Sequence, residues 1–315
     1  MKVYIKKLLK YLFGKTNFRY VNLKKNEIKI KLFLSSDKSK EKYIQKNFKE
    51  RVGYEIDFNN EPKTFNEKIQ FRKLYDKNPL YSICADKYRV REYVKNKIGE
   101  EYLIPLLLVT DKLTEEQWDK LPNQFVAKAN HNSGPVQIVK DKSKVNKKEI
   151  IMKLNYQLKI DYGILSLEKY YSKIHRKIIV EKFLEDDEKS IDLPDYKFYC
   201  FDGKPLYCQL IKDRNTKETI DFYDSDWNLM EFIGLNPIAI HSNKINKKPL
   251  NYKKMLEIAS ILSEDFDYAR VDLYSINNRI YFGEITFCPN GGFGTFKPSH
   301  WNLKLGELWE QKKFK

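Results

Sequence analysis

Two strand-like runs near the C-terminus, joined at Asn277 and Asn278, constrain the fold of this chain more than any other feature. The first run carries Asp272 and the second carries Glu284. These carboxylates lie directly opposite each other if Asn277, Asn278 and Arg279 form a three-residue loop. A two-residue loop would place them on opposite faces of the hairpin, because side chains alternate along a strand.

The three-residue loop also gives the other hairpin residues sensible partners. It predicts the pairs Ile276 with Ile280, Tyr274 with Phe282, Val271 with Ile285, and Arg270 with Thr286. Opposed carboxylates with Cβ atoms roughly 5 Å apart repel each other unless a proton or a cation lies between them. A hard cation such as Mg²⁺ would satisfy them. The alternative is an exposed hairpin whose acids are simply solvated.

The length and composition indicate a folded cytoplasmic protein without a spanning helix. The 315 residues suffice for two packed modules or one large α/β unit, and 42% of them are hydrophobic. The chain contains no apolar run of about 18 residues and no secretory leader. Neither the four cysteines nor the four histidines show zinc-ligand spacing.

The positive charge is concentrated at the N-terminus. Residues 1–51 contain 16 Lys and Arg against 4 Asp and Glu, so most of the net charge of +16 belongs to this arm. The rest of the chain is nearly neutral and has no zinc finger or RNP1-like motif, which argues against binding to nucleic acid.

Residues 1–58 are therefore expected to form a basic N-terminal extension. Residues 1–15 have apolar side chains at helical spacing with lysines between them. Such a helix either lies on an anionic membrane at the inner face, where each basic residue contributes about 1 kcal/mol, or docks on the protein's own core. A strand is predicted at residues 27–34 and a helix at residues 40–49.

Hairpins alternate with helices over residues 59–315, which predicts a layered α+β enzyme. One hairpin is expected at residues 125–141, and another is expected to turn at Asp202 and Gly203. Lys128 lies on the first hairpin, directly before the loop NHNSGP, which includes Ser133 and Gly134. A lysine beside such a loop can bind phosphate, although a solvated edge-strand lysine has the same pattern.

The order of five short motifs resembles the ATP-grasp superfamily. They are Asp86-Lys87, Lys128 with its loop, Glu181-Lys-Phe-Leu184, Arg270-Val-Asp272 and Glu284-Ile-Thr286. The TupA-like branch, named for teichuronopeptide synthesis and similar to proteins encoded among polysaccharide and capsule genes, is closer still. Stretches that resemble this branch include KTFNEKIQFRKLYDKNPL, ADKYRVREYV, FVAKANHNSG, DYKFYCFDGKP and FGEITFCPNGG, so the resemblance covers about residues 61–309.

This resemblance implies two α+β subdomains that sandwich ATP, at about residues 86–184 and 185–315. It implies that Lys87 and Lys128 contact the phosphates under the loop of Ser133 and Gly134. For the base and ribose it implies Glu181, the backbone of Lys182 and Leu184, and either Asp187 or Glu188. Lys197 is either a further γ-phosphate contact or a structural residue.

The resemblance also implies that Asp272 and Glu284 bind one or two Mg²⁺ ions. Much of the superfamily has Asn where this chain has Thr286, which makes Thr286 a weaker third ligand. Arg270 would steady the transferring phosphoryl group or the oxyanion that forms later.

The implied reaction is the activation of a carboxylate by ATP, followed by attack of an amine to form an amide. The implied partners are a uronic acid of a polysaccharide or its precursor and an amino acid or other amine, and the opposite polarity is also open. Asp224-Ser-Asp226 offers an alternative function, because a DxD triplet binds metal and nucleotide sugar in glycosyltransferases. The same triplet also fits a turn with Asx hydrogen bonds.

Overall fold

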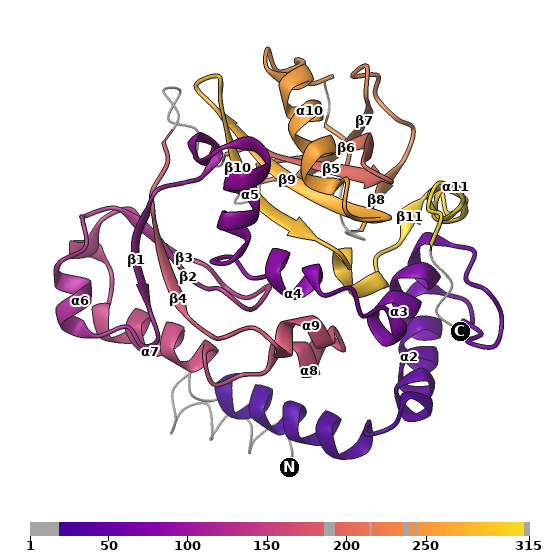
Figure 1. Cartoon of the computed structure of the whole chain (residues 1–315), viewed down its shortest axis with the longest axis horizontal. Coiled ribbons are helices and arrows are strands. Elements are labelled where there is room, and N and C mark those ends of the chain that lie inside the picture. Colours follow the sequence, from indigo (N-terminus) through magenta and orange to yellow (C-terminus); the bar gives the residue numbers. More distant parts are fainter. Residues whose placement is uncertain (1–18, 186–192, 214–215, 236–239, 243–244, 312–315) are drawn as a thin grey trace. The chain divides into compact units, whose positions relative to one another are not determined.

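The computed structural model describes residues 19–185, 193–213, 216–235, 240–242 and 245–311. The chain divides into two compact units. Unit 1 contains residues 1–40, 86–88 and 105–183, and unit 2 contains residues 41–85, 89–104 and 184–315. Each unit combines helices with an antiparallel sheet, which confirms the predicted α+β class (Figure 1).

Unit 1 is built on a four-stranded antiparallel sheet with the order β1-β4-β2-β3. Its strands are β1 (Leu106–Thr110), β2 (Phe125–Ala129), β3 (Gln137–Val139) and β4 (Ile178–Lys182). β2 and β3 form the predicted hairpin, in which Phe125 pairs with Val139. β4 comes last in sequence but lies inside the sheet, and its first four residues are buried.

Side-chain alternation along β2 gives the unit 1 sheet a core face. Phe125, Ala127 and Ala129 are buried, whereas Lys128 on the other face is partly exposed. The core face packs against α6 (Glu115–Asp119) and α7 (Lys147–Gln157), and Trp118 lies edge-on to Phe125 with ring centroids 5.0 Å apart. Two further helices, α8 (Tyr162–Ser166) and α9 (Lys169–Ser172), and a 3₁₀ turn at Lys142–Lys144 complete the elements after β1.

Residues 19–33 form a helix, so the strand predicted at residues 27–34 is wrong. Isoleucines alternate with lysines in this segment, which imitates strand periodicity. Tertiary contacts at helical spacing decide the conformation instead: Tyr20 stacks on Tyr156 at 4.6 Å, and Glu27 accepts a hydrogen bond from the Asp161 N–H at 3.1 Å. The next helix, α2 (Asp37–Val52), confirms the helix predicted at residues 40–49.

The membrane contact predicted for residues 1–15 lies outside the described residues. Among the residues that are described, no helix is long and apolar enough to cross a membrane.

Unit 2 is built on a five-stranded antiparallel sheet with the order β10-β9-β5-β6-β7. Its strands are β5 (Asp195–Phe201), β6 (Lys204–Lys212), β7 (Thr219–Asp224), β9 (Tyr268–Ile276) and β10 (Arg279–Thr286). β5 and β6 form the predicted hairpin, whose turn residues Asp202 and Gly203 both have positive φ. A separate two-stranded sheet pairs β8 (Ile233–Gly234) with β11 (Phe296–Lys297).

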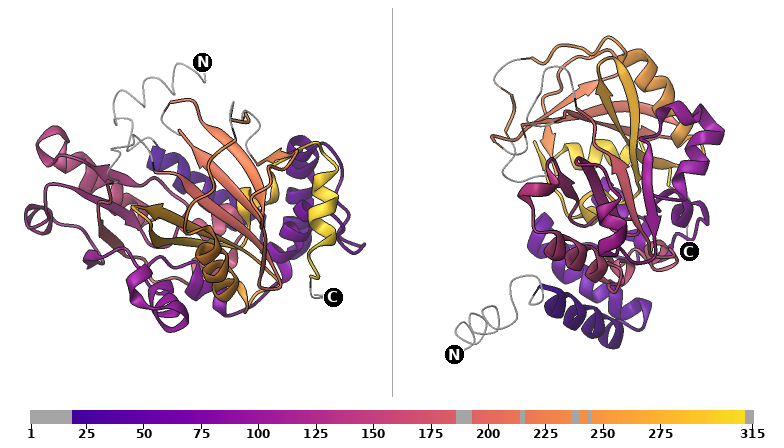
Figure 2. Two further views of the ribbon diagram at one scale, coloured as in Figure 1. Left: turned by 90° about the horizontal axis from the view of Figure 1, so that it is seen from above. Right: turned by 90° about the vertical axis from the view of Figure 1, so that its left-hand side faces the viewer.

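The helices of unit 2 cover one face of the five-stranded sheet and one end of its second face. α10 (Tyr252–Ser263) packs across the first face, where Tyr252 meets Phe198 with centroids 5.9 Å apart (Figure 2). On the second face Phe65 of α3 packs edge-on to Tyr268 at 5.0 Å, beside Trp309. The remaining helical elements are α3 (Phe65–Tyr75), α4 (Leu80–Cys84), α5 (Val90–Ile98), α11 (Trp301–Glu307) and 3₁₀ turns at Glu100–Tyr102 and Pro289–Gly292.

Arg72 fixes α3 to the sheet. Its guanidinium is buried, donates to the Tyr268 carbonyl at 2.8 Å, pairs with Asp267 and lies 4.3 Å from the Trp309 ring centroid. A buried arginine is tolerated when its donors are satisfied in this way. This contact closes one end of the second face and leaves the other end to the charged residues of the site.

The turn of the β9–β10 hairpin differs from the prediction. Asn277 and Asn278 form a two-residue loop with φ of 50° and 60°, as in a type I′ turn, and Arg279 pairs with Ile276. The predicted Ile276–Ile280 and Tyr274–Phe282 pairs are therefore wrong.

A β-bulge at Gly283 nevertheless restores the predicted register beyond it. Phe282 pairs with Leu273 and Glu284 pairs with Asp272, so Gly283 is the one extra residue on β10. The predicted pairs of Asp272 with Glu284, Val271 with Ile285, and Arg270 with Thr286 are confirmed. The turn is one residue shorter than the predicted loop, and the bulge adds one residue to β10. The two acids therefore share a face, as the longer loop would have placed them.

We expect Gly283→Ala to destabilise unit 2. A Cβ atom at position 283 would lie 2.9 Å from the Asp272 carbonyl oxygen, and relieving that contact should cost about 1–3 kcal/mol in the free energy of unfolding, as overpacking does. Urea denaturation measures this cost. Asn278→Gly, which relieves a positive φ in the same hairpin, is the matched control and should be neutral or slightly stabilising. Equal unfolding midpoints for Gly283→Ala and the unaltered chain would contradict the assignment of the bulge.

Candidate active site

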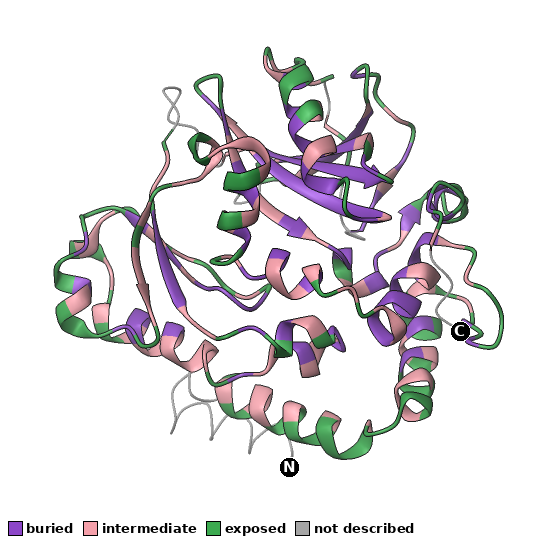
Figure 3. Ribbon diagram, viewed as in Figure 1, coloured by how far each residue is buried: buried purple, intermediate pink, exposed green. Residues whose placement is uncertain are grey.

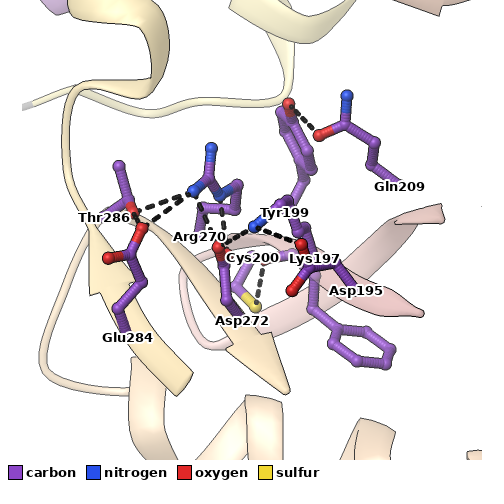
Figure 4. Close-up of polar contacts among 10 residues, drawn as sticks. Asp195, Lys197, Tyr199, Cys200, Gln209, Arg270, Asp272, Glu284 and Thr286 are labelled. Carbon is purple, nitrogen blue, oxygen red and sulfur yellow. Dashed lines mark hydrogen bonds and ion pairs between the residues drawn. The ribbon is translucent and has the colours of Figure 1, made fainter. Parts of the chain in front are cut away.

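The charged residues of unit 2 gather on one face of its sheet because β5 alternates polar and apolar side chains. Asp195, Lys197 and Tyr199 point to this face, and the residues between them point toward α10. Lys197 lies opposite Asp272 on β9, and Tyr199 lies opposite Arg270. Figure 4 shows the resulting cluster, which spans β5, β9 and β10.

Asp272 is the centre of this cluster. Its side chain is buried and bonds to two cations, since Arg270 donates from Nε to Oδ1 at 2.7 Å and from Nη2 to Oδ2 at 2.8 Å. Lys197 donates to the same Oδ2 from the neighbouring strand. A bidentate guanidinium and an ammonium thus neutralise one buried carboxylate.

Glu284 and Thr286 extend the cluster across β10. Arg270 Nη2 lies 3.4 Å from Glu284 Oε1 and 3.0 Å from Thr286 Oγ1, and the Thr286 hydroxyl also donates to Glu284 Oε1 at 3.1 Å. Oxygen atoms of Asp272, Glu284 and Thr286 therefore converge on a single guanidinium nitrogen (Figure 4). The positive charge that opposed carboxylates need is supplied within the protein by Arg270.

The surroundings strengthen these charges. Burial alone would lower the pKa of Arg270, but the adjacent Asp272 and Glu284 carboxylates outweigh it and raise the pKa above its ordinary value. Cys200 lies on the opposite face of β5, where its Sγ is 3.8 Å from the Ala259 carbonyl oxygen of α10, and burial raises the pKa of its thiol to about 12.

The donor set fits Mg²⁺. Two carboxylates and a hydroxyl are hard oxygen ligands, and Mg²⁺ commonly takes one or two carboxylates and completes its shell with phosphate and water. In this structure their oxygens meet at Arg270 Nη2, so a metal ion would bind them beside the guanidinium and not at that point. No group of three or more His, Cys, Asp or Glu side chains within the described ranges is arranged for a metal ion. The three predicted metal ligands, Asp272, Glu284 and Thr286, would hold Mg²⁺ together with substrate oxygens.

In unit 1 two of the predicted ATP ligands pair with each other. Lys128 Nζ on β2 lies 2.6 Å from Glu181 Oε2 on the adjacent strand β4, on the face opposite the core. An ammonium group has three donors, so Lys128 can keep this contact and still bind a phosphate oxygen. The backbone N–H of Lys182 donates to the Pro105 carbonyl at 2.9 Å.

Lys87 is held against the loop that follows β2. Its Nζ donates to the Asn132 carbonyl at 2.7 Å, and its N–H donates to the Asn130 carbonyl at 3.0 Å. Ser133 is exposed, and the Gly134 N–H donates to Asn132 Oδ1 at 3.1 Å. The structure thus brings Lys87 and the predicted phosphate loop together within unit 1.

Asn130 organises this loop, a role that the sequence did not predict. Its side chain is fully buried; Nδ2 donates to Asp86 Oδ1 at 2.8 Å and to the His175 carbonyl at 2.9 Å, and Oδ1 accepts from the Lys177 N–H at 2.7 Å. Its place directly after a strand was a signal, but an asparagine in a polar loop usually indicates exposure.

The remaining predicted residues lie elsewhere. Leu184 lies just beyond β4 in unit 2, whereas Asp187 and Glu188 fall outside the described residues. Gln209, which the sequence also did not single out, pairs with Lys197 across β5 and β6 and lies 3.3 Å from the Tyr199 hydroxyl.

The DxD triplet forms a turn. Asp224 Oδ1 accepts hydrogen bonds from the Asp226 N–H at 2.9 Å and the Asn228 N–H at 2.8 Å. Asp224 Oδ2 accepts from Asn228 Nδ2 at 2.9 Å. These contacts match the Asx turn that was the structural alternative to a glycosyltransferase motif.

The chain belongs to the family described as TupA-like ATPgrasp, whose profile matches residues 67–310. This membership confirms the family predicted from the order of the motifs and its ATP-grasp fold. A search of curated proteins finds no match.

Several solved structures resemble the chain distantly. They include the D-alanine–D-alanine ligase of Bacillus anthracis, with 20% identity and a TM-score of 0.37 over 66% of this chain and 58% of that one. The corresponding Helicobacter pylori ligase has 17% identity and a TM-score of 0.37 over 73% and 62%, and the N5-carboxyaminoimidazole synthetase of Staphylococcus aureus has 12% and 0.34 over 65% and 44%. The chain thus spans about three fifths of the length of the D-alanine–D-alanine ligases.

His131, in the loop that follows β2, should make the free energy of unfolding depend on pH. Its ring is buried, Nε2 donates to the Ile160 carbonyl at 3.1 Å, and burial lowers its pKa from 6.5 to about 4. Between these values the unfolded chain binds a proton that the folded chain excludes, so stability falls as pH falls from 6.5 toward 4. We expect the free energy of unfolding to drop about 2 kcal/mol more between pH 7 and pH 5 than in His131→Gln, which keeps a donor for Ile160. Parallel pH profiles of the two proteins in urea unfolding would show that His131 carries no such linkage.

Proposed function

We propose that this chain is an ATP-dependent carboxylate-amine ligase that forms an amide through an acyl phosphate. The observation that carries the proposal is the convergence of Asp272, Glu284 and Thr286 oxygens on Arg270 in a member of the TupA-like ATP-grasp family. The catalytic region would be residues 59–315, with subdomains at about residues 86–184 and 185–315.

The residues of unit 2 would act on the transferring phosphoryl group. Bound Mg²⁺ would draw negative charge away from the phosphates. Arg270 already lies at the point where the acidic oxygens converge, so its donors are placed to stabilise the phosphoryl group and then the tetrahedral oxyanion. Lys197 would hold Asp272 in position, and it is also a candidate contact for the γ-phosphate.

A second set of predicted residues, between Lys87 and Glu188, would hold the nucleotide. Lys87 and Lys128 are cations next to the loop of Ser133 and Gly134 and would bind phosphate oxygens. Glu181 and the backbone of Lys182 and Leu184 would hold adenine, and Glu188 or its neighbour Asp187 would bind ribose. A loop fixed by Asn130 suits this task, because a preorganised anion site loses little entropy when the ligand binds.

The chemistry requires no nucleophile from the protein. A carboxylate oxygen of the substrate attacks the γ-phosphorus and ADP leaves; the amine then attacks the acyl carbon, phosphate leaves and the nitrogen gives up a proton. Positioning and charge stabilisation supply the rate enhancement. This agrees with a cluster made of acids, cations and hydroxyl groups.

The proposed substrates are a uronic acid of a capsular or other cell-surface polysaccharide, or its precursor, and an amino acid or other amine. The resemblance to TupA-like proteins encoded among polysaccharide and capsule genes supports this assignment. An activated amino acid joined to an amino sugar would use the same site with reversed polarity. We also place the protein in the cytoplasm, at the inner face of the membrane, with residues 1–15 in contact with anionic lipid.

Substitution of the acidic pair tests the ligase assignment. We expect Asp272→Asn and Glu284→Gln each to lower ATP turnover by ~10²–10³, because each removes an oxygen charge from the cluster that orients the phosphates. ADP release in the presence of Mg²⁺ measures this loss. Asp224→Asn, which removes one charge from the Asx turn of the same unit, is the matched control and should keep most of the activity.

The reverse pattern, in which Asp224→Asn stops turnover and the acidic pair is dispensable, would instead support a glycosyltransferase. Thermal unfolding of all three variants separates loss of chemistry from loss of fold.

A substrate screen tests the polarity. We expect ADP release only when a carboxylate and an amine are both present, so pairs of uronic-acid saccharides with amino acids should be compared with each compound alone. Reduction of the uronate carboxyl to an alcohol gives a matched saccharide that cannot be activated. ADP release from an amino sugar with an amino acid, and none from the uronic-acid pairs, would show that the amino acid supplies the activated carboxylate.

A further inference from the structure

The helix at residues 19–33 presents two different faces. One face is attached to unit 1 through Tyr20, which stacks on Tyr156 of α7, and through Glu27, which accepts from the Asp161 N–H. Lys24 bonds to Glu27 at 2.9 Å beside these contacts. The helix is therefore held in a fixed rotation about its axis, and its other face points to solvent.

The solvent face carries a row of apolar side chains. Val21, Ile28 and Leu32 expose 56%, 56% and 69% of their surface. With about 100° of rotation per residue, their spacing places all three within roughly 40° of the helix circumference. Figure 3 shows exposed and intermediate residues along this helix, in contrast to the buried strands. We call Val21, Ile28 and Leu32 the apolar stripe.

Exposed lysines lie beside the apolar stripe. Lys25 and Lys29 are exposed, and they lie about 40° and 80° around the helix axis from the middle of the stripe. An ordinary solvated helix face would carry polar residues in place of the stripe, and an apolar face that packs on the core would be buried, whereas this stripe is exposed. Apolar residues bordered by lysines are the pattern of a helix that lies in the interface of an anionic bilayer.

We propose that the apolar stripe, with Lys25 and Lys29, is a docking surface for a bilayer that contains anionic phospholipid. The helix would lie in the plane of the interface, with Val21, Ile28 and Leu32 between the head groups and the lysines at the phosphate level. This surface is separate from the contact assigned to residues 1–15 and independent of the ligase chemistry.

Charge selects the bilayer over other partners from this chain. Residues 1–51 have a net charge of +12, so docking of the N-terminal segment onto the stripe would bring lysines against lysines. Pairing of two copies through the stripe would do the same. An anionic lipid surface instead attracts each lysine and also takes up the apolar side chains.

Vesicle binding of the full-length protein tests the proposal. The unaltered chain should sediment with vesicles of phosphatidylcholine and phosphatidylglycerol in equal parts and remain in solution with phosphatidylcholine alone. We expect the double variant Lys25→Gln/Lys29→Gln to bind roughly 30-fold more weakly at low salt, from the contribution of two lysines near the surface. Ile28→Ser/Leu32→Ser should bind at least about tenfold more weakly at every salt concentration, because it removes the apolar contribution.

Matched variants distinguish the stripe from general charge and hydrophobicity. Lys120→Gln/Lys144→Gln removes the same charge at two exposed lysines elsewhere in unit 1, and Ile245→Ser/Leu250→Ser removes two exposed apolar side chains of unit 2. Both should bind vesicles like the unaltered chain. The stripe variants should also keep their ATP turnover in solution, so the result does not depend on the ligase assignment.

A fluorescent label locates the contact directly. All four cysteines are buried, so a single introduced cysteine can be labelled selectively with an environment-sensitive dye. The emission maximum of a dye attached at Ile28→Cys should shift to shorter wavelength on anionic vesicles. The emission of a dye at Asn26→Cys, an exposed residue away from the stripe, should not shift. Equal spectra at both positions, or vesicle binding that ignores Ile28→Ser/Leu32→Ser, would overturn the proposal, as would failure of the unaltered chain to bind.

Discussion

The ion pair between Asp272 and its two cations is the interaction on which the architecture of unit 2 most depends. Three strands contribute to it, since Lys197 comes from β5, Arg270 and Asp272 from β9, and the oxygens of Glu284 and Thr286 from β10. A buried ion pair gains little stability over apolar packing, because desolvation offsets most of the Coulomb energy. Removing one partner is nevertheless costly, so the three strands are locked into one register. The charges that fix the sheet are also those that chemistry on a phosphoryl group requires.

The cationic side chains of the predicted site are held differently in the two units. In unit 2 Asp272 and Glu284 each have a cation in contact, and the cluster is built on the strands of a sheet. In unit 1 the cations are next to a loop, and their position depends on hydrogen bonds that Asn130 makes with segments before and after it in sequence. The first arrangement favours stabilisation of charge that moves during reaction, and the second favours binding of a charge that is already present.

The sequence predicted the face that Asp272 and Glu284 share, but for an incomplete reason. Strand alternation favoured a three-residue loop over a two-residue loop, because a two-residue loop without a bulge puts the acids on opposite faces. The structure has the two-residue loop, and the register shift between Phe282 and Glu284 restores the shared face. The helix at residues 19–33 was missed because alternation of isoleucine and lysine satisfies strand and helix patterns equally over a few residues. Its conformation follows from tertiary contacts of Tyr20 and Glu27, which no sequence window contains. Asn130 was missed for the same kind of reason, since its partners lie more than forty positions away in either direction.

The order of strands in unit 1 has a consequence for how the protein is made. β4 (Ile178–Lys182) separates β1 (Leu106–Thr110) from β2 in the sheet, yet it is the last of the four to leave the ribosome. β2 and β3 can close early as a local hairpin, whereas the partner of β1 arrives about seventy residues later. A nascent chain therefore carries an unpaired apolar strand, LLLVT, through most of the synthesis of this unit. Completion of the unit 1 sheet would thus coincide with the emergence of Glu181, the residue that pairs with Lys128.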